Sequence, residues 1–216
     1  MSPHASSLTD EKPTVVIIDD DPSVRKAISN LCESVGLGVC AFASTTEFLR
    51  WTVPEAPLCM VLDVRMPGEN GLDFQLELSK SHAEIPVVFI TAHGDIPMSV
   101  RAMKAGALEF LTKPFRDQEL LDAINAGLAK SHVRRCTLTA NAELLTRYES
   151  LSSREREVMD LITKGQLTKQ IAVQLGLSEI TVKVCRAQLM KKMQANSLLE
   201  LGRMSEKLDR IKKTPD

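Results

Sequence analysis

The chain has 216 residues, 44% of them hydrophobic and 25% charged, which is the composition of an ordinary globular protein of one or two domains. No apolar run approaches the ~18 residues that cross a membrane, and residues 1–13 lack the basic and apolar segments of a secretory signal. The five cysteines are scattered and form no C-x-x-C pair, which argues against a disulfide framework or a zinc site. We therefore expect a cytoplasmic protein without a membrane partner.

The formal net charge of −1 conceals an asymmetry along the chain. Residues 151–216 carry 13 basic and 8 acidic side chains, whereas residues 1–150 carry 14 basic and 20 acidic ones, so the two parts have charges of +5 and −6. An acidic front half joined to a basic back half predicts two domains, the second of which faces nucleic acid. A charge of +5 is also compatible with a role in solubility alone.

The front half alternates short apolar strands with amphipathic helices. Helical spacing of apolar residues predicts helices at 22–35, 98–105 and 116–128, and Ser44 can cap a further short one. The periodicity of 71–80 is mixed, so a helix there is predicted partly from the βα alternation. Five βα units predict a doubly wound parallel sheet with helices on both faces. The strands are predicted from β-branched and apolar runs at 14–18, 39–42, 58–62, 86–90 and 108–112.

Polar residues follow these strands at one edge of the sheet. Carboxylates there attract a hard divalent ion such as Mg²⁺, and the Asp63 carboxylate can act as a covalent nucleophile toward phosphate. Thr91 and Lys113 can bind the oxygens of the phosphoryl group, and Pro114 fixes the backbone after Lys113. Right-handed crossovers bring all strand carboxyl ends to this edge, which gathers Asp19, Asp20, Asp63, Thr91 and Lys113.

Each of these residues also has an ordinary explanation. An Asp after a strand is usually a turn residue, a Lys is usually solvated, and a Thr at a strand end follows β-propensity. Asp21 can simply serve the start of the next helix. Because all the residues fall at strand carboxyl ends, their coincidence favours a phosphoacceptor at Asp63 with a metal ion held by Asp19, Asp20 and Asp63.

The motifs at these strand ends resemble those of response-regulator receiver domains, over residues 14–128. The resemblance implies a flavodoxin-like fold, a phosphoryl group received from a sensor histidine kinase, and a Mg²⁺ site completed by the backbone carbonyl of Arg65. It also implies a switch formed by Thr91, Ala92 and Phe110, although a core aromatic explains Phe110 equally well. The motifs are Ile-Ile-Asp-Asp-Asp at 17–21, Leu-Asp-Val-Arg-Met-Pro-Gly at 62–68, Thr-Ala-His-Gly at 91–94, Lys-Pro-Phe at 113–115, and a run at 90–107 that is similar to the FixJ group.

Residues 129–150 have weak periodicity, and we interpret them as a partly helical linker. The pattern of the segment after it, 151–213, predicts a domain of four helices. A short second helix, a glycine-containing turn and a longer third helix at 179–193 predict a helix-turn-helix at about 168–187. The fold class is therefore α/β followed by all-α. The expected helix caps are a Ser152–Glu155 capping box, Thr168, Ser178 and Ser197.

The third helix divides into two faces at 100° per residue. One face collects Val182, Cys185, Leu189 and Met193 and is expected to be buried. The opposite face presents Lys183, Val184 and Ala187 to the base edges of a major groove. A solvated charged face explains each lysine alone but not the whole pattern. The predicted DNA-binding residues are Thr181, Lys183, Val184, Ala187 and Gln188, with Lys169, Lys191 and Lys192 assigned to phosphates.

Residues 151–207 also resemble the LuxR-type, NarL-like DNA-binding domain. Two positions differ from its common pattern, since Cys185 replaces His and Thr168 replaces Asn. Ala187 stands where some relatives have a base-contacting Lys, so an apolar contact is expected there. The resemblance implies that the fourth helix pairs two copies on DNA, although Gly202 weakens that helix by roughly 1 kcal/mol. The motifs are Leu-Ser-Ser-Arg-Glu-Arg-Glu-Val at 151–158, Lys-Gln-Ile-Ala at 169–172, Leu-Gly-Leu-Ser-Glu-Ile-Thr-Val-Lys-Val at 175–184 and Lys-Lys-Met at 191–193.

Together these patterns predict a DNA-binding transcriptional response regulator in which phosphate on Asp63 favours dimerisation and promoter binding. The predicted partners are a sensor histidine kinase, promoter DNA, a second copy of the chain and RNA polymerase. We expect no enzyme activity beyond slow hydrolysis of the chain's own aspartyl phosphate. One alternative is a phosphorylation-independent DNA-binding protein that uses the receiver fold to dimerise. Another is a haloacid-dehalogenase-type enzyme, which needs a second Asp where this chain has Arg65.

Overall fold

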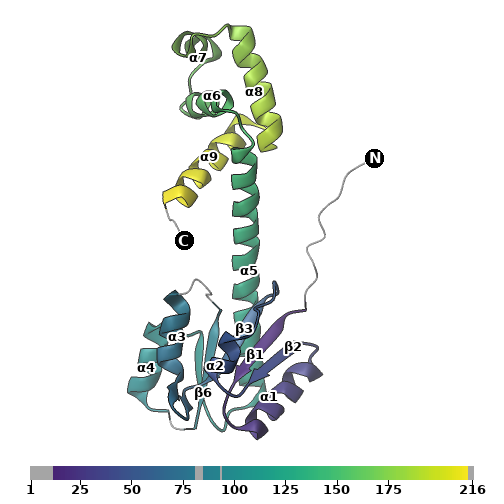
Figure 1. Cartoon of the computed structure of the whole chain (residues 1–216), viewed down its shortest axis with the longest axis vertical. Helices are drawn as coiled ribbons and strands as arrows, with labels where there is room; N and C mark the ends of the chain where they lie inside the picture. Colours follow the sequence, from purple (N-terminus) through teal and green to yellow (C-terminus); the bar gives the residue numbers. More distant parts are fainter. Residues whose placement is uncertain (1–11, 81–84, 93, 214–216) are drawn as a thin grey trace. The chain divides into compact units, whose positions relative to one another are not determined.

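The computed structural model describes residues 12–80, 85–92 and 94–213. The chain divides into two compact units, one up to Arg135 and one from Cys136 onward. The first unit contains a sheet covered by helices, and the second consists of helices (Figure 1). No helix within the described ranges combines the length and the apolar character that spanning a bilayer requires.

A five-stranded parallel sheet forms the centre of the first unit. Its strand order is β2-β1-β3-β6-β7, which confirms the predicted flavodoxin-like arrangement. After β1 the chain adds β2 on one side of it, and then adds β3, β6 and β7 on the other side. Ligands of such sheets bind where this order changes, beside the carboxyl ends of β1 and β3. The strands are β1 (Thr14–Ile18), β2 (Gly38–Phe42), β3 (Leu58–Asp63), β6 (Val87–Thr91) and β7 (Glu109–Thr112).

Helices cover both faces of this sheet, as predicted (Figure 1). Side chains alternate along each strand, so Val15 and Ile17 join one core while Val16 and Ile18 join the other. Burial on both faces explains why the strands appear in the sequence as continuous apolar runs. One core includes α1 (Pro22–Ser34) and α5 (Asp117–Glu149), and the other includes α2 (Thr45–Leu49), α3 (Gly71–Lys80) and α4 (Ile96–Lys104).

Two segments of the first unit before α5 differ from the sequence-based expectation. The segment after Asp63, expected to be a loop, forms a small antiparallel hairpin of β4 (Arg65–Met66) and β5 (Glu69–Asn70). Helix α4 begins at Ile96 and not at residue 98. The earlier start follows from Asp95, whose side chain accepts a hydrogen bond from the Met98 N–H at 2.7 Å and so caps the helix.

Helix α5 is longer than the sequence predicted. It runs without interruption from Asp117 to Glu149, through the whole segment that we interpreted as a partly helical linker. Its first turns bury Leu120 and Ile124 in the core of the first unit, and Leu144 is buried in the core of the second. Because the helix changes its packing partner along its length, its apolar stripe is interrupted, which is why the periodicity of 129–150 is weak.

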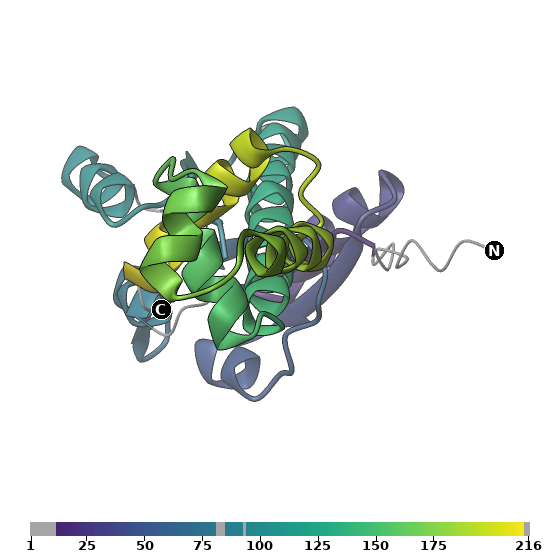
Figure 2. The same cartoon turned by 90° about the horizontal axis from the view of Figure 1, so that it is seen from above.

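The second unit packs α8 against α6 and α7, as Figures 1 and 2 show from two directions. The predicted capping box is confirmed, since the Glu155 N–H donates to Ser152 Oγ at 3.3 Å and the Ser152 N–H donates to Glu155 Oε2 at 2.7 Å. The predicted cap at Thr168 is wrong, because Thr168 already lies in the first turn and Leu167 precedes it. The helices are α6 (Ser153–Thr163), α7 (Thr168–Leu175), α8 (Glu179–Met193) and α9 (Leu198–Lys213).

Candidate phosphoacceptor site and nucleic-acid interface

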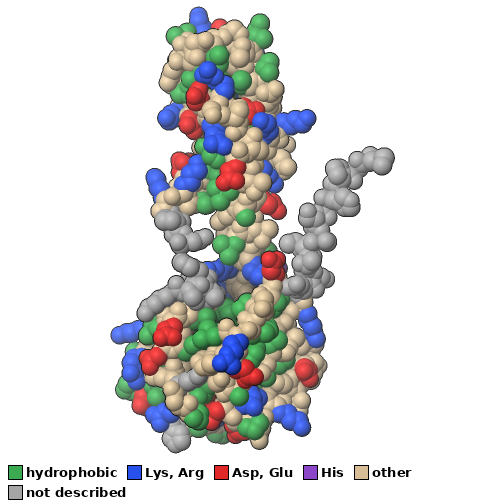
Figure 3. All heavy atoms as spheres, in the orientation of Figure 1, with side chains coloured by type: hydrophobic (Ala, Val, Ile, Leu, Met, Phe, Trp, Pro, Cys, Tyr) green, Lys and Arg blue, Asp and Glu red, His purple; other side chains and the backbone are tan. Residues whose placement is uncertain are grey.

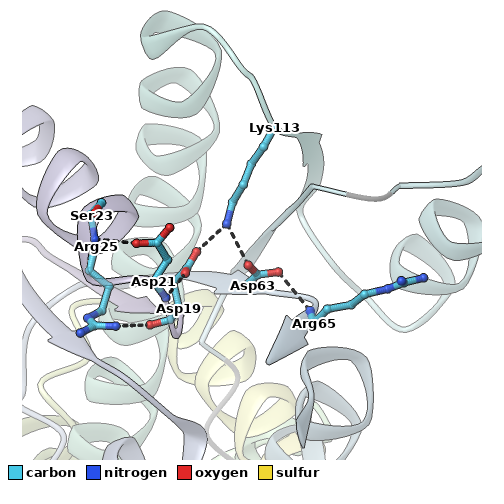
Figure 4. Close-up of polar contacts among 7 residues, drawn as sticks. All are labelled: Asp19, Asp21, Ser23, Arg25, Asp63, Arg65 and Lys113. Atoms are coloured by element: carbon cyan, nitrogen blue, oxygen red, sulfur yellow. Dashed lines mark hydrogen bonds and ion pairs between the residues drawn. The ribbon is translucent and has the colours of Figure 1, made fainter. Parts of the chain in front are cut away.

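Three side chains from separate strands meet at the carboxyl edge of the sheet. Asp19 follows β1, Asp63 ends β3 and Lys113 follows β7. Lys113 Nζ donates hydrogen bonds to Asp19 Oδ2 at 2.6 Å and to Asp63 Oδ2 at 2.8 Å. Figure 4 shows the ammonium group between the two carboxylates. The parallel topology therefore brings together residues that lie 50 and 94 positions apart in the sequence.

The same edge offers ligands for a divalent cation. One oxygen atom each from Asp19, Asp20 and Asp63 lie within 4.8 Å of one another. Asp19 is fully buried, Asp63 is 7% exposed and Asp20 is exposed, so a bound ion would keep one side open to water. Carboxylate oxygens combined with retained waters are the environment that Mg²⁺ prefers. This acidic pocket can therefore bind a divalent metal ion.

Burial and pairing act on these charges in opposite directions. Burial raises the pKa of Asp19, and the hydrogen bond from Lys113 reduces this shift without cancelling it. Burial also disfavours the charged form of Lys113, but its hydrogen bonds to Asp19 and Asp63 outweigh burial and raise the pKa of Lys113. Lys113 is therefore cationic at neutral pH and offsets part of the negative charge at this edge.

Backbone groups hold both buried carboxylates in place. The Asp21 N–H donates to Asp19 Oδ1 at 2.8 Å, and the Arg65 N–H donates to Asp63 Oδ1 at 3.0 Å. The Arg65 side chain extends away from Asp63, so that only its backbone belongs to the site (Figure 4). Asp21 has the ordinary role considered for it, because it caps α1 by accepting a hydrogen bond from the Ser23 N–H at 2.8 Å.

The other predicted phosphate-site residues lie on and after β6 and β7. Thr91, the last residue of β6, is 1% exposed, and Ala92 after it is exposed. The Lys113 N–H donates to the Thr91 carbonyl oxygen at 2.7 Å, which joins the two strand ends. The peptide bond between Lys113 and Pro114 is cis. The strand ends of β6 and β7 are thus tied to each other beside the acidic pocket.

Phe110 on β7 is half-buried, with its ring centroid 6.5 Å from that of Phe89. Gly94 lies beside it, and a Cβ atom at position 94 would come within 2.7 Å of Thr112 Cγ2 and 3.0 Å of Phe110 Cε1. A side chain at this position would therefore crowd the predicted switch residues. Gly94 belongs to the Thr-Ala-His-Gly motif at 91–94, but the sequence assigned no role to it, because a local pattern does not show which side chains approach a glycine.

Arg25 and Gly71 are two further residues that the sequence did not single out. Arg25 Nη1 donates to the Asp19 carbonyl oxygen at 2.6 Å and so ties α1 to the end of β1. Gly71 allows the start of α3 to approach the Asp63 carbonyl oxygen, which a Cβ atom would overlap. Both contacts join residues whose proximity depends on the packed sheet, so no local pattern indicates them.

Helix α8 separates into the two faces that its sequence predicts. Val182, Leu189 and Met193 are buried and Cys185 is half-buried. Basic side chains lie among acidic ones on the visible face of the second unit (Figure 3), so no continuous basic patch appears on that face. The predicted DNA-binding residues are all exposed, namely Thr181, Lys183, Val184, Ala187, Gln188, Lys169, Lys191 and Lys192.

Lys192 has a second role that its sequence position did not reveal. Its Nζ donates to Glu155 Oε2 at 2.6 Å and to the Ser150 carbonyl oxygen at 3.2 Å. The Glu155 side chain is only 4% exposed, whereas that of Lys192 is 40% exposed. Burial opposes ionisation of Glu155, but the hydrogen bonds from Lys192 and Ser152 outweigh burial and lower the pKa of Glu155. The Lys192 ammonium is therefore already paired with Glu155 inside the second unit, and this ion pair competes with a contact between Lys192 and a DNA phosphate.

We expect Lys192→Met to lower the free energy of unfolding of the second unit by about 1–2 kcal/mol, because it leaves the buried Glu155 carboxylate without its cation. The expected loss of unfolding free energy is modest, since solvent partly screens the charge of the half-exposed lysine. Lys191→Met is the matched control: it should leave stability unchanged and reduce the slope of log affinity for DNA against log salt by about 1. Urea unfolding followed by circular dichroism, and DNA titrations at several salt concentrations, measure the two effects.

The ion pair between Lys192 and Glu155 also predicts that the free energy of unfolding of the second unit depends on pH. The folded-state pKa of Glu155 lies below its ordinary value of 4.5, so its stabilising contribution is present above pH 4.5 and is lost as the pH falls through the folded-state pKa. In Lys192→Met this acid-dependent part of the unfolding free energy should shrink. Equal stability of the Lys191 and Lys192 variants at neutral pH would contradict this role of the pair.

Comparison with known proteins extends over both units. The model of the "Response regulator receiver domain" family matches residues 15–125, and that of "Bacterial regulatory proteins, luxR family" matches residues 149–205. Nodulation protein W of Bradyrhizobium diazoefficiens is 53% identical over 197 residues, which cover 91% of this chain and 87% of that protein. The transcriptional regulatory protein FixJ of Azorhizobium caulinodans is 44% identical over 191 residues, which cover 88% and 90%.

Solved structures agree with this match. The response regulator StyR has a TM-score of 0.84 at 48% identity, with 91% of this chain and 99% of that one covered. Full-length FixJ from B. japonicum has a TM-score of 0.53 at 35% identity, with 91% and 97% covered. These comparisons confirm the FixJ-type resemblance of both sequence halves. The chain belongs to the two-component response regulators that join a receiver domain to a LuxR-type DNA-binding domain, and it is a transcriptional regulator.

Proposed function

We propose that Asp63 is the residue of this regulator that accepts the phosphoryl group from a sensor histidine kinase. The observation that carries the proposal is the Lys113 ammonium held between the Asp19 and Asp63 carboxylates at 2.6 and 2.8 Å. An Asp63 oxygen attacks phosphorus as the bond between phosphorus and the histidine nitrogen breaks, and that nitrogen takes up a proton. Lys113 is placed to pair with the added phosphoryl oxygens.

We assign the metal site to the carboxylates of Asp19, Asp20 and Asp63 and to the backbone carbonyl of Arg65. The donor set consists of hard oxygen ligands, which suits Mg²⁺. When bound, the ion would neutralise charge on the phosphoryl group as it approaches the carboxylates. Arg65 supports this assignment because its N–H already holds Asp63 while its side chain points away (Figure 4). Residue 65 is Arg where a haloacid-dehalogenase-type enzyme usually has its second Asp, which argues against that class of enzyme.

Thr91, Ala92 and Phe110 form the switch in this proposal. Thr91 is buried at the end of β6, next to the end of β3 that carries Asp63, and Phe110 lies on β7 in a half-buried position with Gly94 at its edge. A phosphoryl group on Asp63 would draw the Thr91 hydroxyl toward it, and space vacated by Thr91 is then available to the Phe110 ring. Such a local change biases a two-state domain rather than deforming it continuously.

In the second unit we assign Lys183, Val184, Ala187 and Gln188 to the major groove, with Thr181 at the start of the same helix. Exposure of this face and burial of the opposite one support the assignment. Lys169 and Lys191 contact DNA phosphates in this proposal. Lys192 contributes less to phosphate binding, because its ammonium is hydrogen-bonded to Glu155. Two phosphorylated copies would pair on promoter DNA, and RNA polymerase bound at the same promoter would be a further partner. The protein would act in the cytoplasm, where the promoter DNA lies.

The domain limits that accompany this function are a receiver domain at 14–128, a helical connector at 129–150 and a DNA-binding domain at 151–213. Burial of Leu144 and packing of Tyr148 in the second core argue for extending the DNA-binding unit back into α5. The phosphate would leave Asp63 by slow hydrolysis within the receiver itself, since its carboxylates and metal site remain open to water on the Asp20 side.

Labelling of the full chain by acetyl phosphate tests the proposal. With Mg²⁺ present the chain should acquire one acid-stable, base-labile phosphoryl group, and its affinity for promoter DNA should rise. Removal of the metal with EDTA should reduce labelling to background, because the Lys113 ammonium alone would then offset the charge of three carboxylates that face the phosphoryl group. Promoter binding that is strong without label and unchanged by it would favour the phosphorylation-independent alternative.

A further inference from the structure

A cavity of about 520 Å³ opens at the edge of the sheet opposite to Asp63. It lies beside the first residue of β6, Val87, and beside the turn at Ala105 and Gly106 that leads into β7. Residues of α3 and of α5 complete its wall. Its volume is typical of sites for small organic ligands. Because it lies at the amino ends of the strands, it is separate from the phosphoacceptor site.

The lining combines an apolar surface with positive charge. Leu78, Ile85 and Val133 contribute apolar side chains, and Lys130 and Arg134 contribute cationic ones. Among the described residues that line the cavity there is no acidic side chain. An apolar wall with positive charge beside it favours a ligand that has an apolar body and a carboxylate.

Gln75 adds an independent observation. It lies on the buried side of α3, is 6% exposed, and lines the cavity. Its Oε1 atom is fully buried and has no hydrogen-bond partner among the described residues. A buried acceptor without a donor costs free energy, so a polar side chain at this position is unexpected unless something in the cavity donates to it.

We infer that this cavity binds a small organic acid that has an apolar body and a hydroxyl or amide donor. The donor would bond to Gln75 Oε1, the body would pack on Leu78, Ile85 and Val133, and the carboxylate would pair with Lys130. The ligand would contact α5, the helix that continues into the second unit. This site is additional to phosphorylation of Asp63 and does not depend on it.

Isothermal titration of the unphosphorylated full chain tests the inference with three matched probes. The first, 3-(4-hydroxyphenyl)propionate, has all three features and should bind with a Kd of about 1 mM or tighter, as expected for a ligand of its size. The second, 3-phenylpropionate, lacks the hydroxyl, and the third, 4-(3-hydroxypropyl)phenol, lacks the charge. Each should bind about tenfold more weakly, since each loses one buried or charge-assisted hydrogen bond.

Variants then locate the bound probe. Lys130→Met should weaken binding of the first probe about tenfold, and Lys26→Met, on the exposed side of α1, should not change it. Gln75→Leu should remove the advantage of the hydroxyl, so that the first two probes bind equally. Because Lys130 is exposed, its variant remains informative even if Gln75→Leu folds poorly. Failure of the first probe to bind, or binding that neither Lys130→Met nor Gln75→Leu alters, would overturn the inference and leave water as the occupant.

Discussion

Asp63→Asn is expected to reduce labelling of the chain by acetyl phosphate to background. An amide oxygen is a poor nucleophile toward phosphorus, and the substitution also removes one anionic ligand from the predicted metal site. Phosphodonor-dependent promoter binding should be lost together with the label. Mass spectrometry of the intact chain and DNA titration with and without acetyl phosphate measure the two effects.

Folding and labelling can be separated in this experiment. Asp63→Asn weakens the ion pair with Lys113 but also relieves repulsion between two buried carboxylates, so the variant should unfold at about the same temperature as the natural chain. Asp73→Asn, an exposed acid on α3, is the matched control and should retain full labelling. Label that persists in Asp63→Asn at the natural level would assign the phosphate to another residue and contradict the proposed site.

Leu144→Ala is expected to lower the free energy of unfolding of the second unit by about 3 kcal/mol. Leu144 is 6% exposed and belongs to the same buried core as Val158 and Leu189, although it lies on α5. Truncating a buried leucine removes apolar burial and leaves a cavity. The loss should appear in urea unfolding followed by circular dichroism and in weaker DNA binding at elevated temperature.

Matched measurements confine this effect to the second unit. Leu138→Ala changes an exposed leucine of the same helix and should alter stability by less than about 0.5 kcal/mol. The single tryptophan, Trp51, packs in a core of the first unit, so its fluorescence transition should be the same in both variants. A Leu144→Ala chain as stable as Leu138→Ala would mean that residues before 151 contribute nothing to the DNA-binding unit.

Tyr148 gives a reason why the end of α5 belongs to that unit. Lys212 Nζ lies 3.7 Å from the Tyr148 ring centroid, and the Arg156 guanidinium carbon lies 5.1 Å from it. Cations near an aromatic face contribute roughly 0.5–2 kcal/mol. These contacts join α5 to α6 and α9, three helices that no short sequence window contains.

The sequence by itself determined the strands, the parallel topology and the place of Asp19, Asp63 and Lys113 at one sheet edge. Those features follow from local patterns, because an apolar run of given length must be buried and right-handed crossovers place every strand end on the same side. The capping box at Ser152 and the two faces of α8 could also be predicted because they are local sequence patterns. Each depends on residues within one or two helical turns.

Only the tertiary structure decided how these elements depend on one another. It showed that α5 continues to Glu149, that Lys192 pairs with Glu155, and that Arg25 and Gly71 lie against the backbone carbonyl oxygens of Asp19 and Asp63. The physical reason is common to all of them. A side chain whose partner lies on another element has the same local sequence whether it faces solvent or is paired, so only the packed chain distinguishes the two.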